Sequence, residues 1–180
     1  MKKTTTLFLS IIILSISINL NAQSTIEWSK DRKLTWSDFK AIPDEDILGY
    51  ALTSYKIEIL PSDVLVDSNN NIQNYKSLTV VANFYSNYSW VHKKSDYLLS
   101  HEQLHFDIAG LYAYKIRMEF EKLKKQKIAN FDSYIEIYEN LWAECRQTQK
   151  AFDKESSHGQ LIEENNNWID KITTEINNLE

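Results

Sequence analysis

The stretch from Ser100 to Phe106 reads Ser-His-Glu-Gln-Leu-His-Phe and contains the pattern H-E-x-x-H. Residues four apart lie on one face of an α-helix, so the imidazoles of His101 and His105 can both reach one metal ion. Glu102 lies one position round from the first histidine, where a carboxylate can reach a water molecule at the metal's open position. The spacing therefore predicts a helix that carries a zinc site. The alternative is a helix with two core or surface histidines and an exposed Glu102.

Residues 1–22 have the composition of a secretory signal peptide. Lys2 and Lys3 precede an apolar run from Leu7 to Leu20, and Ala22 is a small residue at the expected cleavage point. The run contains Ser and Asn and is shorter than the roughly 20 apolar residues that a membrane span needs. We therefore expect a secreted or periplasmic protein without a stable membrane span after cleavage of the signal peptide. An uncleaved anchor is the alternative.

Residues 23–180 have the length of one domain with a single core. Cys145 is the only cysteine in the chain, which excludes an intrachain disulfide and a site built from several thiolates. The formal net charge is −5, and the one Lys-rich run, residues 122–127, is balanced by the neighbouring Glu119 and Glu121, so no nucleic-acid partner is expected. With only 3 Gly and 2 Pro, the composition favours long regular elements.

The N-terminal half is predicted to form a small antiparallel sheet. Residues 50–60 are rich in Thr, Tyr and Ile, and apolar and polar residues alternate over residues 55–59, which is typical of a strand with one buried face. We interpret residues 64–66 as the start of a second strand and residues 78–90, rich in β-branched and aromatic side chains, as one or two more. Before the sheet, a turn or short helix is expected to bring Trp36 and Phe39 into the core.

The C-terminal half is predicted to form three helices. Ser95 is followed by an acid, and apolar residues then recur at steps of three and four to about Lys124, so the face with the two histidines is also the buried face. Ser133, with a Glu three residues later, predicts the start of a second helix, which Gly159 ends. A third helix is expected over residues 161–179. The predicted fold class is α+β, with the sheet packed on these helices.

A catalytic zinc ion usually has three protein ligands and one open position. If the first two helices form an antiparallel hairpin about residue 128, the level of residue 103 recurs about 25 residues after the turn, since both helices have the same rise per residue. Asp153, Glu155 and His158 lie at this level, and all are zinc-ligand types. His158 is the preferred third ligand. Asp153 and Glu155 are the alternatives, and a carboxylate that is not a ligand would orient an imidazole.

Three segments together carry a family resemblance: residues 34–39 (Leu-Thr-Trp-Ser-Asp-Phe), 101–108 (His-Glu-Gln-Leu-His-Phe-Asp-Ile) and 152–159 (Phe-Asp-Lys-Glu-Ser-Ser-His-Gly). With the export signal, they resemble an uncharacterised bacterial family of secreted proteins described as zinc-dependent proteases and classified as a domain of unknown function. The similarity covers nearly all of the mature chain. It implies a zincin-like fold and peptidase activity, and the family's protease description depends on the same H-E-x-x-H pattern.

The function predicted from these residues is zinc-dependent hydrolysis of a peptide or protein. Glu102 would accept a proton from the Zn²⁺-bound water and pass it to the leaving amine. The strand within residues 78–90 is expected to bind an extended substrate along its edge. One alternative is a noncatalytic exported envelope or binding module with a structural or vestigial metal site. Another is a zinc hydrolase of nonpeptide amides or esters, which the same water and base would serve.

Overall fold

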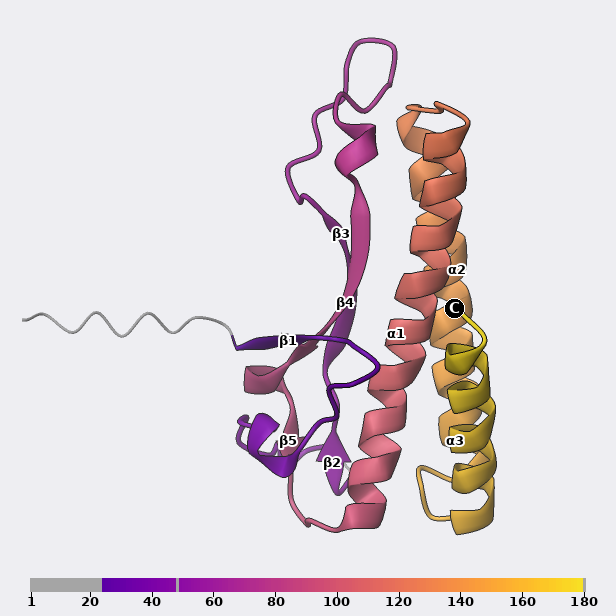
Figure 1. Cartoon of the computed structure of the whole chain (residues 1–180). Coiled ribbons are helices and arrows are strands. Elements are labelled where there is room, and N and C mark those ends of the chain that lie inside the picture. Colours follow the sequence, from indigo (N-terminus) through magenta and orange to yellow (C-terminus); the bar gives the residue numbers. More distant parts are fainter. Residues whose placement is uncertain (1–23, 48, 180) are drawn as a thin grey trace, which may run out of the picture.

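The computed structural model describes residues 24–47 and 49–179, so the predicted signal peptide, residues 1–22, lies outside the described residues. The described part of the chain forms two small antiparallel sheets followed by three α-helices, which confirms the predicted α+β class (Figure 1). No helix within these residues is long and apolar enough to cross a membrane.

The described part of the chain contains three α-helices. They are α1 (Asp96–Lys125), α2 (Phe131–Glu155) and α3 (Ile162–Asn177). Figure 1 shows α1 in the middle, with the larger sheet on one side and α2 and α3 on the other, and α1 contacts all of these elements. α1 and α2 form the predicted antiparallel hairpin, so the end of α2 returns to the level of the H-E-x-x-H segment.

The strands form two separate sheets, and β4 is the central strand of the larger one. In chain order they are β1 (Thr25–Glu27), β2 (Ala51–Leu52), β3 (Tyr55–Leu60), β4 (Thr79–Tyr85) and β5 (Trp90–Val91). β4 pairs antiparallel with β1 and β3, and β2 pairs antiparallel with β5. β3 pairs with residues 79–84 of β4 on one edge, and β1 pairs only with residues 83–85 on the other. Part of one edge of β4 therefore has no partner strand among the described residues, and binding of a substrate there stays a prediction.

The predicted strand over residues 64–66 is absent, and Val66 forms only a single bridge, to Ile72. The reason is local. The Asp67 side chain accepts hydrogen bonds from the backbone amides of Asn69 and Asn71, at 2.8 and 2.9 Å, which closes a tight loop. Side chains of Asp that bond nearby amides in this way compete with strand ladders for the same backbone groups.

Side-chain caps decide where the helices begin. Ser95 caps α1 as predicted, and its hydroxyl accepts a hydrogen bond from the third backbone amide after it. α2 begins at Phe131, because the Asn130 side chain accepts the hydrogen bond from the amide of Ser133, and the prediction that Ser133 is itself the cap is wrong. α2 also ends before Gly159, and residues 156–160 form a turn.

The N-terminal segment packs on the surface of α1. The indole Nε1 of Trp28 donates to Asp107 at 2.8 Å, and the ammonium of Lys33 lies 3.0 Å from the same carboxylate. Gly110, one turn further along α1, lies directly under the indole, where an added Cβ would be 2.1 Å from the ring. The close approach therefore requires a glycine at this position of the helix.

Candidate metal centre

The two histidines of the H-E-x-x-H segment project from one face of α1, as their spacing predicts. Their ring centroids are 4.9 Å apart, and the Phe152 ring of α2 packs on both, at 4.6 and 4.9 Å. His101 is 4 % exposed. The face that carries the motif is thus a buried face of the helix, which confirms the sequence prediction.

The Nδ1 atoms of both histidines are held by side-chain amides. Nδ1 of His105 lies 2.5 Å from Oε1 of Gln149, whose Nε2 donates to the backbone carbonyl of His105 at 2.8 Å. Nδ1 of His101 lies 2.9 Å from Oδ1 of Asn165 on α3. An amide oxygen only accepts hydrogen bonds, so each Nδ1 carries a proton and each Nε2 is left for a second proton or a metal ion.

The Nε2 atoms of the two histidines face Asp153 near the end of α2. The Oδ1 atom of Asp153 lies 3.2 Å from Nε2 of His105 and 3.7 Å from Nε2 of His101. Among the described residues, these three side chains form a group whose ligand atoms all lie within 4.8 Å of one another. Three electron-pair donors that converge in this way repel one another unless a proton or a metal ion lies between them.

The other two candidate ligands lie outside this group. His158 is 77 % exposed, and its Nδ1 is 3.6 Å from Oδ1 of Asp153. Glu155 accepts a hydrogen bond from the indole of Trp168 on α3, at 2.8 Å, and is thereby turned towards α3. The cluster thus lies at the height along α2 that the hairpin predicted. Its geometry favours Asp153, the alternative, over His158 as the third ligand.

Burial and charge shift the pKa values within the cluster. Burial, with a contribution from nearby His105, lowers the pKa of His101 to about 4, so this imidazole is neutral at neutral pH. Burial also lowers the pKa of His105, but its hydrogen bond to Asp153 and the charges of Glu102 and Asp153 outweigh burial and raise it. Burial raises the pKa of Asp153, yet the hydrogen bond from His105 and the histidine charges lower it overall. Asp153 is therefore ionised.

Glu102 lies in the same cleft and has one fixed carboxylate oxygen. The hydroxyl of Thr53 donates to Oε2 of Glu102 at 2.6 Å, and Glu102 is 4 % exposed. Burial raises the pKa of this carboxyl above its usual value, although His105 and the bond from Thr53 act in the opposite direction. A raised pKa and a free second oxygen are what a general base near neutral pH needs.

A left-handed turn after α2 covers the ring of His101. Ser157, His158 and Gly159 have φ values of 51°, 53° and 76°. A Cβ on Gly159 would lie 3.0 Å from both Cγ and Nδ1 of His101. The hydroxyl of Tyr97 donates to the carbonyl of Gly159 at 2.5 Å, which ties the turn to the first turn of α1. Gly159 thus supplies both the backbone conformation and the space that the His101 ring needs.

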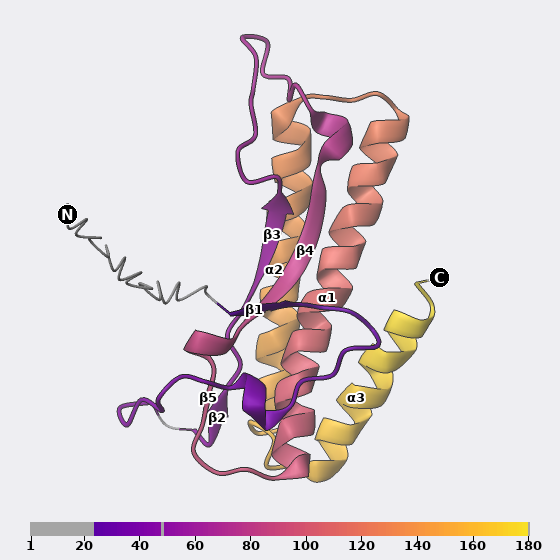
Figure 2. The same ribbon diagram turned by 60° about the vertical axis from the view of Figure 1, so that its left-hand side comes forward.

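The cluster opens into a cleft of about 900 Å³ at the end of the molecule where β2 and β5 lie beside the start of α1 (Figure 2). Its wall includes His101, Glu102, His105, Asp153 and His158 on the helical side. The opposite wall is the extended segment around β2. All the predicted site residues except Glu155 therefore line one cavity.

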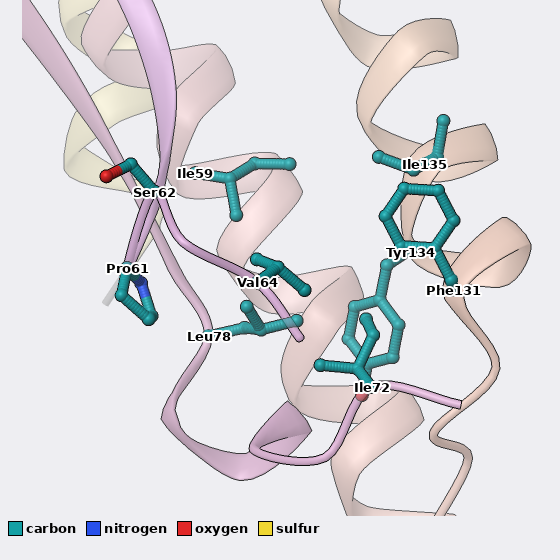
Figure 3. Close-up of a pocket in the computed structure, with 9 residues that line it drawn as sticks. All are labelled: Ile59, Pro61, Ser62, Val64, Ile72, Leu78, Phe131, Tyr134 and Ile135. Carbon is teal, nitrogen blue, oxygen red and sulfur yellow. The ribbon is translucent and has the colours of Figure 1, made fainter. Parts of the chain in front are cut away.

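A smaller cavity of about 240 Å³ lies at the other end of α2 (Figure 3). Figure 3 shows Ile59, Val64 and Leu78 facing Tyr134 and Ile135 of α2. The two cavities are about 30 Å apart along the helix, at 1.5 Å per residue. None of the described residues that line the smaller cavity is a histidine or a carboxylate, so it has no counterpart of the metal-binding cluster.

Comparison with known proteins bears on the segment that carries the cluster. The family described as "Bacterial protein of unknown function (DUF922)" matches residues 85–159, a stretch that contains α1, α2 and all three residues of the cluster. No curated protein and no solved structure matches the chain. The match supports the resemblance in its coarser form, a bacterial family of unknown function.

Three polar residues of the site were not predicted: Thr53, Gln149 and Asn165. Gln149 is four residues before Asp153 on α2, and this spacing puts both on one helix face, so it was open to prediction once Asp153 was chosen. Thr53 and Asn165 carry no such signal, because their positions depend on how β2 and α3 pack against α1.

Proposed function

We propose that the chain is a zinc-dependent hydrolase, most directly a peptidase, with His101, His105 and Asp153 as metal ligands and Glu102 as general base. The proposal depends on one observation: three donor atoms from two helices lie within 4.8 Å of one another. The amide oxygens on both Nδ1 atoms support it, since they leave the Nε2 lone pairs for a metal.

The distances from Asp153 to the two histidines fit a zinc ion, and so does the charge of the site. Ligands at about 2.0–2.1 Å from a tetrahedral zinc lie about 3.3 Å from each other. Asp153 is 3.2 and 3.7 Å from the two Nε2 atoms, close to this spacing. The carboxylates of Glu102 and Asp153 together would balance the two charges of the ion, in a place where burial makes uncompensated charge costly.

A bound zinc ion supplies a water molecule with a pKa lowered to about 7 and polarises a carbonyl oxygen. Glu102 would accept the proton of the attacking water at the oxygen that Thr53 does not bind, while Thr53 keeps the other oxygen fixed. The same carboxyl would then donate that proton to the leaving amine as the C–N bond breaks. Gln149 and Asn165 keep the imidazoles in the orientation that the ligand atoms need.

Three protein ligands favour a catalytic site over a structural one, which four ligands would close. The cleft beside the cluster provides access for a substrate. Hydrolysis of a nonpeptide amide or ester would use the same residues. A noncatalytic module with a structural metal site would instead need a fourth protein ligand. Export through residues 1–22 is part of this proposal, and the N-terminal sequence of the mature protein tests it.

The experiment combines metal analysis with a hydrolysis assay. Protein purified without chelator is expected to carry about one zinc ion per chain. His101→Ala, His105→Ala and Asp153→Asn should each lose the metal, whereas Asp132→Asn, an exposed acid in the first turn of the same helix, should retain it. His158→Ala should also retain it.

Glu102→Gln separates binding from catalysis. This variant should keep its zinc and lose hydrolysis of casein and of a quenched fluorescent peptide by about 100-fold or more. Retention of full activity by Glu102→Gln would refute the role of Glu102. Loss of zinc in His158→Ala together with retention in Asp153→Asn would instead identify His158 as the third ligand. Activity on a nitrophenyl ester alone, with no peptide cleaved, would favour the nonpeptide hydrolase.

A further inference from the structure

The cleft opposite the cluster has an apolar rim. Ile47, Tyr50, Leu52 and Leu98 line it, and three of them belong to the extended segment on the far side from α2. Tyr50 is 64 % exposed, Ile47 43 % and Leu52 38 %. Large apolar side chains that gather at the mouth of a polar site, and that the protein leaves exposed, indicate a binding surface for an apolar group.

The charged side chains that line the cleft all belong to the proposed metal site or lie beside it. Among the described residues that line it, none is Lys or Arg, so no cation apart from a protonated histidine is present for the C-terminal carboxylate of a substrate. The lining carboxylates are Glu102 and Asp153, which bind Thr53 and the histidines. Both lining carboxylates have roles in the proposed site, Glu102 as the base and Asp153 as a metal ligand, so neither is left to pair with the ammonium group at a substrate's N-terminus.

We propose, on the basis of the proposed function, that the substrate is an internal segment of a polypeptide with a bulky apolar side chain next to the scissile bond, and that Tyr50 and Leu52 contact this side chain. Burial of a Phe or Leu side chain against such a rim favours binding by about tenfold or more over Ser. A free chain end gains no ion pair with a Lys, an Arg or an uncommitted carboxylate among the described residues of the lining. The chain is thus an endopeptidase with apolar preference.

Matched peptides test the proposal on the full mature chain loaded with zinc. Two blocked decapeptides differ only in a central Phe or Ser, and a third has the Phe sequence cut to a dipeptide with free ends. We expect kcat/KM for the Phe decapeptide to exceed that for the Ser decapeptide by about tenfold or more, with negligible cleavage of the dipeptide. The metal-loaded Glu102→Gln variant should bind the two decapeptides with the same ratio of Kd values.

Matched variants assign the preference to the rim. Tyr50→Ser should reduce the Phe-to-Ser ratio to about one third or less. Tyr88→Ser should leave the ratio unchanged, because Tyr88 is similarly exposed, at 59 %, but is not among the residues that line the cleft. Leu52→Ser and Leu65→Ser form a second pair with the same logic, since Leu65 is exposed and also lies away from the cleft.

The outcomes separate the two proposals. Equal kcat/KM for the two decapeptides, with zinc bound and cleavage dependent on Glu102, would overturn the apolar preference and leave the proposed function intact. Faster cleavage of the dipeptide would overturn the internal-segment specificity alone. Absence of zinc or of Glu102-dependent cleavage would refute the proposed function, and equal Kd values with the Glu102→Gln variant would then overturn the apolar rim independently.

Discussion

Gly159 lies where the turn after α2 touches the ring of His101, and Gly159→Ala tests whether this contact positions the metal site. The residue has a φ of 76°, and a Cβ there would approach Cγ and Nδ1 of His101 to 3.0 Å. An Ala in the left-handed region costs about 1–2 kcal/mol, and displacement of the ring adds to this cost. A loss of about 2 kcal/mol would lower Tm by about 4–8 °C for a domain of this size.

The same substitution should weaken metal binding. To make room, the His101 ring must move by a few tenths of an ångström against its 2.9 Å contact with Asn165. Disturbance of the groups that orient a ligand typically costs 10- to 100-fold in metal affinity, so we expect about that loss. Thermal unfolding of the metal-free protein measures the first effect, and competition for zinc with a chromogenic chelator measures the second.

Gly49→Ala is the matched control. Its Cβ would meet only ordinary contacts, at 3.5 and 3.8 Å, so both Tm and zinc affinity should stay close to those of the parent. If Gly159→Ala also matched the parent in both measurements, the argument that the turn positions His101 would be refuted. A lower Tm with unchanged zinc affinity would limit Gly159 to a role in stability.

Three further predictions follow from described contacts. Gln149→Leu removes the partner of Nδ1 of His105 and should lower zinc affinity 10- to 100-fold with the circular dichroism spectrum unchanged. Because the pKa of His101 is lowered to about 4, this side chain binds a proton more tightly in the unfolded chain than in the folded one. The free energy of unfolding of the metal-free protein should therefore fall by about 3 kcal/mol as the pH falls from 6.5 to 4. Urea unfolding at the two pH values measures this change, and the His101→Gln variant is the control. Gly110→Ala forces the Trp28 indole off α1 and should lower the free energy of unfolding by about 1–3 kcal/mol. The same substitution should have a smaller effect in a Trp28→Ala background, where the indole is absent.

The helical part of the site was predictable because it depends on periodicity. The spacing of His101 and His105 fixes a shared face wherever the helix lies, and equal rise per residue in two antiparallel helices located the level of Asp153. The first argument uses only local geometry. The second also assumes that the two helices form an antiparallel hairpin, and it needs no further tertiary contact.

The choice between Asp153 and His158 was not predictable in the same way. It depends on where α2 stops, and the helix ends at Glu155, after which His158 adopts a left-handed conformation that its sequence context did not indicate. Thr53 was missed for a related reason. Its distance to Glu102 is set by how the sheets pack on α1, which no periodicity in the chain specifies.

The hairpin of α1 and α2 has a consequence for how the chain tolerates changes in length. His105 and Asp153 face each other across two helices that join far from the cluster, so one residue inserted into α2 before Asp153 would rotate its carboxylate by about 100° around the helix axis. Seven residues added to each helix near the bend would complete almost two turns and restore the facing. Functional chains of different length should therefore differ here by paired heptads, while single-residue insertions should be confined to the connection between the helices.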